Sequence, residues 1–251
     1  MQIKKEEKLK ILIFSICSFV VIFIGVICGF SLNNLKNDSK KLPDELKKNT
    51  NILLIFLDEG KKEADGIFAV SLDPKNNKID LDDIPRTAKT VYDGADDTFR
   101  GIYSENGAEA LKECVGKEKN IKFDKYICLD RDLLEKTVNT TGDIAVDFKG
   151  AVSFSQNGES FSFEKGECLL NPVQFALCFA YLCRDGEKKD NKPELLKSFF
   201  KRLSGADFAP WQQKEFLNIV KQSKTDIASY DFDDLAKIFL SMDNAEITVK
   251  Q

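Results

Sequence analysis

Two carboxylates and one guanidinium stand at the ends of consecutive apolar stretches in this chain. They belong to Asp58, Asp65 and Arg86. The stretches are Ile52–Leu57, Ile67–Leu72 and Ile79–Ile84. Each stretch is short and bounded by charged or turn residues, which favours buried strands over helices. The three charged side chains therefore lie beside strand ends, where binding sites in open α/β sheets usually form.

The chain contains no histidine. This excludes a Ser-His or Cys-His nucleophile and the imidazole class of metal ligand. Any bound metal must have oxygen ligands, which points to Mg²⁺ or Mn²⁺. Beyond the N-terminal apolar segment stand Cys114, Cys128, Cys168, Cys178 and Cys183. Their odd number and the lack of a C-x-x-C spacing argue against a zinc site or a complete disulfide framework, so we expect buried free thiols.

The charged residues belong to a longer series of motifs that resembles the LytR-CpsA-Psr family of cell-envelope proteins. That family shows N-I-L-L-L-G-x-D, R-x-D-T, V-S-I-D-P and I-P-R-D in this order. The matching residues here are Asn51–Leu54 with Asp58, then Asp65, Ser71–Pro74 and Ile84–Arg86. Similarity continues at Lys122–Phe148, at Leu170–Asn171 with Gln174, and at Lys224–Phe239. The resemblance therefore covers nearly the whole chain after the N-terminal apolar segment.

The resemblance implies a phosphotransferase that attaches a secondary wall glycopolymer, carried on polyprenyl pyrophosphate, to peptidoglycan. In such a reaction a sugar hydroxyl attacks phosphorus, and charge neutralisation matters more than a protein nucleophile. By analogy, Asp58 and Asp65 would hold Mg²⁺ or Mn²⁺, and Arg86 would bind the pyrophosphate. These three are the expected catalytic residues.

Several family positions differ in this chain. Glu63 replaces an arginine two residues before the second aspartate, and Thr87 replaces the acid of I-P-R-D. Ala180 and Leu182 stand at two further arginine positions. Arg100 and Arg184 are the candidates to replace the lost substrate-binding arginines, and Glu63 could join the two aspartates as a metal ligand.

These differences leave two hypotheses open. The first is an active transferase. The second is a catalytically inactive relative that binds lipid-linked envelope intermediates or assists an active paralogue. The observation that distinguishes the two hypotheses is whether the side chain of Arg184 or Arg100 lies close to Asp65 and Arg86.

The remaining pattern predicts an α/β domain. Expected strands are 52–57, 67–72, 78–84, 123–129 and 143–148, then a hairpin around Asn157-Gly158 and a last strand at 246–249. Expected helices are 105–115, 131–139, 172–183, 194–203, 210–222 and 231–242. Such alternation is typical of a sheet with helices on its faces. The resemblance implies a three-layer α/β/α domain with a mixed central sheet.

The N-terminal segment predicts attachment to a membrane. Residues 11–30 carry no charge and are long enough to cross a bilayer core of roughly 30 Å as one helix. A cleaved signal peptide is the alternative, but no A-x-A-like site follows. We therefore expect a cytoplasmic N-terminus (1–10), a transmembrane helix (11–30), an extracytoplasmic linker (31–50) and one LytR-CpsA-Psr-like domain (51–251). Lysines flank the segment on both sides, so the family architecture sets this orientation.

The composition argues against nucleic acid as a partner. The net charge is −4, and the sequence shows no basic face interleaved with aromatic residues. The expected partners are therefore the cell membrane, the lipid-linked glycopolymer and peptidoglycan, with an active paralogue under the second hypothesis.

Overall fold

The computed structural model describes residues 42–156, 158–184, 191–204, 209–228 and 231–250. The chain divides into two compact units, Met1–Leu42 and Pro43–Gln251, and the described helices and strands belong to the second. The expected cytoplasmic N-terminus and transmembrane helix, residues 1–30, lie outside the described residues. Among the helices that are described, none combines the length and the apolar content needed to span a membrane.

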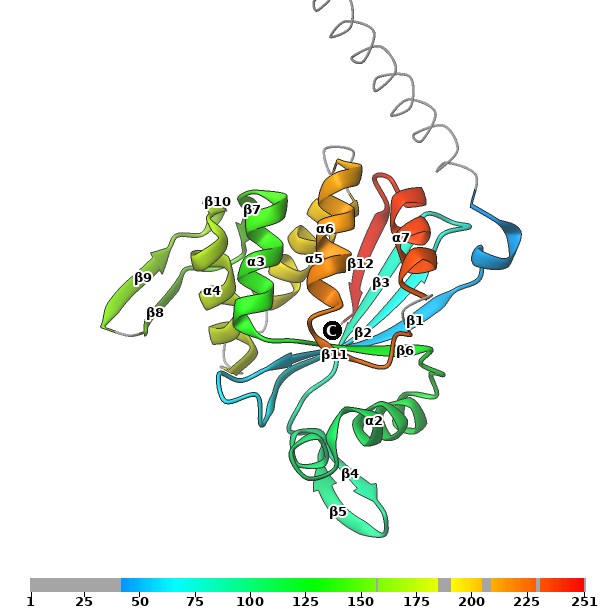
Figure 1. Cartoon of the computed structure of the whole chain (residues 1–251). Coiled ribbons are helices and arrows are strands. Elements are labelled where there is room, and N and C mark those ends of the chain that lie inside the picture. The colour runs from blue at the N-terminus through cyan, green and yellow to red at the C-terminus, as the bar shows by residue number, and fades with distance from the viewer. Residues whose placement is uncertain (1–41, 157, 185–190, 205–208, 229–230, 251) are drawn as a thin grey trace, which may run out of the picture. The chain divides into compact units, whose positions relative to one another are not determined.

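A six-stranded mixed sheet forms the centre of the second unit (Figure 1). Its order is β11 (Lys224–Thr225), β6 (Lys125–Leu129), β1 (Thr50–Leu57), β2 (Ala64–Asp73), β3 (Lys78–Asp83) and β12 (Glu246–Lys250). The pairs β1–β6 and β3–β12 are parallel, and the other neighbours are antiparallel. The mixed central sheet expected from the sequence is confirmed.

The middle strands are apolar on both faces because helices cover both faces. Leu53, Ile55 and Leu57 of β1 join the core built on α2 (Phe99–Lys119). From the opposite face, Phe56 meets Phe179 of α4 (Pro172–Arg184) edge-on, with ring centroids 5.0 Å apart. Figure 1 shows α2 on one side of the sheet and the later helices on the other. Continuous apolar strands are what a sheet buried on both faces requires.

The remaining elements complete the two faces and their margins. The later helices are α3 (Arg131–Thr141), α4, α5 (Asn191–Ser204), α6 (Pro210–Val220) and α7 (Asp231–Ser241). Three two-stranded sheets are β4 (Lys89–Tyr92) with β5 (Ala95–Thr98), β7 (Ile144–Phe148) with β10 (Gly166–Leu170), and β8 (Val152–Gln156) with β9 (Glu159–Phe163). A 3-10 turn, η1 (Asp44–Leu46), lies between Leu42 and β1.

Most expected elements are present, and the differences have local causes. The hairpin is β8–β9, with Gly158 at φ +82°, a conformation that glycine adopts without strain. Helix α2 begins at Phe99 rather than Glu105, because the Thr98 side chain caps it by accepting from Gly101 N at 3.1 Å. The strands β4, β5, β10 and β11 were not predicted. They are short and polar or half exposed, so they carry little apolar alternation.

The cysteines match the expectation of free thiols. Cys114, Cys128, Cys178 and Cys183 are buried, Cys168 is partly buried, and none of these five forms a disulfide. Burial raises the pKa of Cys128 to about 12. These side chains therefore act as small apolar groups of the core.

Phe179 is a direct test of the packing between α4 and the sheet. Phe179→Ala should lower the free energy of unfolding by about 3–5 kcal/mol, because a buried ring is lost and its site cannot fully collapse. Denaturant unfolding of the full chain measures this. The exposed Val91 is the matched control, since Val91→Ala should change stability by less than about 0.5 kcal/mol. Equal effects of the two substitutions would contradict the packing described here.

Candidate functional site

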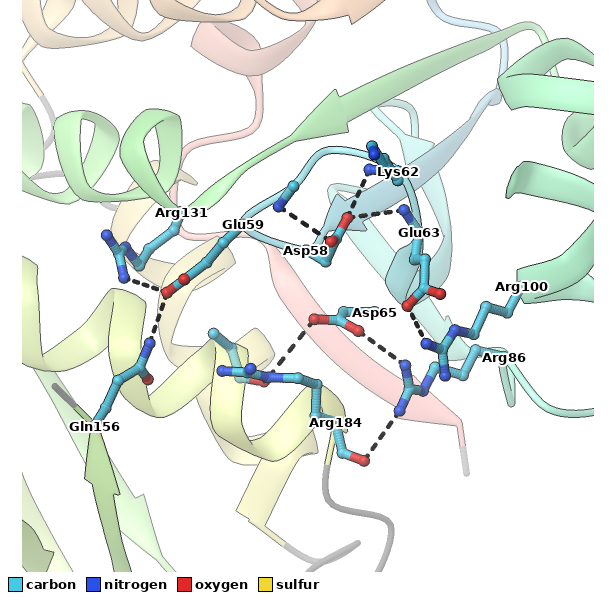
Figure 2. Close-up of polar contacts among 12 residues, drawn as sticks. Asp58, Glu59, Lys62, Glu63, Asp65, Arg86, Arg100, Arg131, Gln156 and Arg184 are labelled. Atoms are coloured by element: carbon cyan, nitrogen blue, oxygen red, sulfur yellow. Dashed lines mark hydrogen bonds and ion pairs between the residues drawn. The ribbon is translucent and has the colours of Figure 1, made fainter. Parts of the chain in front are cut away.

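The loop between β1 and β2 holds Asp58 in a fixed orientation (Figure 2). Asp58 Oδ1 accepts from the backbone N–H groups of Lys62 at 2.7 Å and Glu63 at 2.8 Å, and Oδ2 accepts from Gly60 at 3.0 Å. Burial alone would raise the pKa of Asp58, but the three N–H donors and the charge of Arg100 outweigh it. The pKa of Asp58 therefore lies below its ordinary value, and the carboxylate is charged at neutral pH.

Asp65 owes its direction to a β-bulge. The β1–β2 register pairs Phe56 with Gly66 and Leu57 with Ala64, so Asp65 is the extra residue between them. Regular alternation would place Asp65 on the same face as Ile67, toward α2. The bulge reverses this alternation and turns the side chain toward the end of α4, where it pairs with Arg184.

Two arginines converge on the buried Asp65. Arg86 Nη1 donates to Asp65 Oδ1 at 2.8 Å, and Arg184 Nε lies 3.6 Å from Oδ2. Arg86 Nη2 also donates to the backbone carbonyl of Arg184 at 3.2 Å. Asp65 is only 4% exposed. Burial raises its pKa, the charges of Arg86 and Arg184 act against this rise, and the charge of Asp58 adds to it.

Close packing brings the end of α4 to this place. A Cβ atom on Gly66 would come within 2.8 Å of Cys183 Sγ, so the absence of a side chain lets α4 approach β2. Arg184 follows Cys183 as the last residue of the helix. Arg184 thus lies beside Asp65, although it comes from the second half of the chain.

Arg100 lies on the same flank and pairs with Glu63. Its Nη2 atom contacts Glu63 Oε2, and its backbone N–H donates to the Arg86 carbonyl at 2.9 Å. Glu63 is not grouped with Asp58 and Asp65 among the described residues. In the part of the chain that the structure describes, no three acidic, cysteine or histidine side chains are grouped to hold an ion. Glu63 instead balances a new cation beside the site.

The opposite flank holds a polar cluster that the sequence did not reveal. Glu59 Oε1 accepts from Arg131 Nη1 at 2.6 Å and from Gln156 Nε2 at 2.7 Å. In Figure 2 these side chains lie on one side of Asp58 and Asp65. Arg86 and Arg100 lie on the other side. The three residues come from the β1–β2 loop, α3 and β8. No motif joins them, because only the fold brings together elements so far apart in the chain.

The donor set of the site is compatible with a hard divalent cation. Asp58 and Asp65 are close enough for the charge of one to raise the pKa of the other. Mg²⁺ is usually bound through one or two carboxylates, with water and substrate phosphate oxygens completing its ligands. Asp58 and Asp65 would be the two carboxylates of such a site.

Comparison with known protein families identifies relatives of this chain. The model of the LytR_cpsA_psr family matches residues 30–191. The polyisoprenyl-teichoic acid–peptidoglycan teichoic acid transferase TagV of Bacillus subtilis is 27% identical over 195 residues, which are 71% of this chain and 50% of TagV. The corresponding transferase TagU of Halalkalibacterium halodurans is 29% identical over 129 residues, 51% of this chain and 41% of TagU. The chain thus spans about half the length of these curated relatives.

Solved structures share the fold. The crystal structure of B. subtilis TagV matches with a TM-score of 0.65 at 22% identity, covering 82% of this chain and 85% of that one. The structure of protein gbs0355 from Streptococcus agalactiae gives a TM-score of 0.66 at 21% identity, covering 82% and 78%. At this level of identity the similarity establishes the architecture alone.

The hydrogen bonds to Asp58 predict a pH-dependent contribution to stability. Asp58→Ala should lower the free energy of unfolding by about 1–3 kcal/mol at pH 7, because three backbone donors lose their acceptor. The folded pKa is depressed, so this contribution is present above the unfolded pKa of about 3.9 and is lost as the pH falls through the folded value. Denaturant unfolding from pH 7 to pH 3, with a chelator present, measures it.

The control for this experiment is Asp96, an exposed residue of β5. Asp96→Ala should change the free energy of unfolding at pH 7 by less than about 0.5 kcal/mol. A difference between wild type and Asp58→Ala that stays constant down to pH 3 would show that the carboxylate charge is not what holds the loop.

Proposed function

Because the chain belongs to the LytR-CpsA-Psr family, we propose that it transfers a secondary wall glycopolymer from polyprenyl pyrophosphate to peptidoglycan. The observation that carries this proposal is the convergence of Arg86 and Arg184 on Asp65, with Arg100 beside them. The names of the curated relatives, transferases of teichoic acid to peptidoglycan, support the same substrate classes. Three arginines and two carboxylates are a suitable set for a charged pyrophosphate.

Each side chain has a separate task in the proposed reaction. The guanidinium groups of Arg86 and Arg184 bind pyrophosphate oxygens and fix the orientation of the phosphorus. Asp58 and Asp65 would hold Mg²⁺, which when bound supplies positive charge against the phosphate oxygens. Asp58 remains available as a ligand because its backbone donors keep it ionised.

The bonds exchanged follow from the substrates. A sugar hydroxyl of peptidoglycan attacks the phosphorus that carries the glycopolymer. The bond from that phosphorus to the bridging oxygen breaks, polyprenyl monophosphate leaves, and the hydroxyl proton passes to solvent. The negative charge that develops on the phosphoryl and leaving oxygens is what the arginines stabilise.

We place this reaction at the outer face of the cell membrane. The support is the uncharged segment 11–30, which is long enough for one transmembrane helix. The resemblance to the family supports a position of the domain outside the cell. There it reaches both the lipid carrier and the wall.

A second function is favoured by one feature of the site. Glu63 places a carboxylate on the phosphate flank and occupies Arg100. If this pair persists with ligand bound, fewer cations remain for the developing charge, and the protein would bind lipid-linked intermediates or assist an active paralogue without turnover. Single-turnover assays with lipid-linked polymer and peptidoglycan distinguish the two, since only the transferase releases polyprenyl monophosphate.

Substitution of Arg184 tests the proposed phosphate site with little effect on the fold. Arg184→Ala should weaken the binding of polyprenyl pyrophosphate at least about tenfold, the effect of losing roughly 1.4 kcal/mol of charge-assisted hydrogen bonding. Arg86→Ala should abolish binding, because its guanidinium both binds phosphate and pairs with Asp65. Calorimetry with and without Mg²⁺ measures both.

The controls separate site effects from folding. Arg184→Ala keeps the backbone carbonyl that accepts from Arg86, so the helix end should stay in place. Lys201→Ala removes an exposed cation of α5 and should not change binding. Wild-type affinity in Arg184→Ala would remove the principal support for the transferase.

A further inference from the structure

A row of stacked aromatic rings leads away from the site on the flank opposite Arg100. Tyr181 of α4 stacks on Phe154 of β8 with centroids 4.7 Å apart and planes at 17°. Phe154 stacks in turn on Phe161 of β9 at 5.1 Å and 20°. Tyr181 and Phe161 are partly exposed, and Phe154 is 9% exposed. The stack is therefore buried at its middle ring and partly exposed at Tyr181 and Phe161, and we call these three rings the aromatic platform.

The platform begins beside the phosphate site. Tyr181 precedes Arg184 by three residues in the same helix. Residues three apart share one face of a helix, so the ring and the guanidinium project to the same side of α4. The row of rings thus extends directly from the residue that pairs with Asp65.

Polar side chains border this platform. Gln156 lies two residues after Phe154 in β8, so both point to the same face of the hairpin. Gln156 joins Glu59 and Arg131 in the cluster described above. Glu59 and Arg131 carry opposite charges, so this flank has no net charge from the pair, unlike the arginine flank.

The outer face of the same hairpin has a different character. It presents Ser153, Ser155, Ser160 and Ser162, whose hydroxyls pair across the strands at 3.1 Å. All four serines are exposed. The aromatic rings are therefore confined to the face that meets α4 and the site.

We propose that Phe161, Phe154 and Tyr181, with Gln156, Glu59 and Arg131 at their edge, form a binding subsite for an uncharged pyranose sugar. A pyranose ring offers an apolar face that packs on aromatic rings and hydroxyls that exchange hydrogen bonds with planar polar side chains. An apolar surface with a few convergent polar groups is typical of small-molecule sites. A lipid chain could pack against the rings, but it would form no hydrogen bonds with the polar side chains at their edge.

This inference rests on the proposed function, in which sugars lie on both sides of the reacting phosphorus. One belongs to the carried glycopolymer and the other to the peptidoglycan acceptor. Both present the same ring chemistry to the platform. The experiment decides which of the two it binds.

The test uses phosphate-free sugars and the full chain in detergent micelles. One probe is the N-acetylglucosamine–N-acetylmuramic acid disaccharide of peptidoglycan with its lactyl carboxyl group amidated, which removes the charge of the acid. The other is the reducing-end disaccharide released from a lipid-linked wall glycopolymer. Saturation-transfer NMR titrations should show binding of at least one. The first probe would identify an acceptor subsite and the second a donor subsite, and failure of both to bind would overturn the inference.

Variants locate the binding on the hairpin. Phe161→Ala and Gln156→Ala should each weaken the binding of the sugar about tenfold, which is equivalent to roughly 1.4 kcal/mol. Gln156 is a surface residue whose loss leaves the core intact. Ser162→Ala, on the outer face of the same hairpin, should have no effect. Equal sugar affinity in wild type and both inner-face variants would overturn the inference.

Pyrophosphate binding separates this inference from the proposed function. If pyrophosphate binds but neither sugar does, only the subsite is wrong. If the sugar binds and pyrophosphate does not, the transferase proposal fails while the subsite stands.

Discussion

The ion pair between Asp65 and Arg86 is the interaction on which the arrangement of this site depends. It joins β2 to the segment after β3. Arg86 also donates a hydrogen bond to the backbone carbonyl of Arg184, the last residue of α4. A buried carboxylate is costly unless it is paired and hydrogen-bonded. Arg184 adds a second positive charge to Asp65. One carboxylate therefore fixes the relative positions of two strands and a helix end, and it keeps two arginines where an anionic ligand can reach them.

The loop between β1 and β2 is fastened on both sides. Glu59 and Lys61 pair with Arg131 and Asp130 at the start of α3, while Glu63 pairs with Arg100 at the start of α2. Asp58 binds three backbone N–H groups within the loop itself. A loop held in this way loses little further conformational freedom when a ligand binds, which is the benefit of preorganisation.

Charge divides the site into two flanks. Arg86, Arg100 and Arg184 supply a cationic flank, whereas Glu59 and Arg131 balance each other beside the aromatic rings. A glycopolymer on a pyrophosphate carrier has the same division into charged phosphates and uncharged sugars. Glu63, which stands where the family pattern has an arginine, pairs with Arg100 on the cationic flank.

The sequence by itself determined the apolar strands, the helix positions, the absence of imidazole chemistry and the candidates Asp58, Asp65 and Arg86. These are local properties, since strands of six or so apolar residues and capped helices are recognisable from neighbouring residues alone. Only the tertiary structure decided that Arg184 lies beside Asp65 and that Glu63 pairs with Arg100. The direction of Asp65 depends on a bulge, a shift in pairing between two strands that neither strand encodes alone. The cluster of Glu59, Arg131 and Gln156 joins three elements far apart in the chain, so its existence follows from packing and from no spacing that a sequence displays.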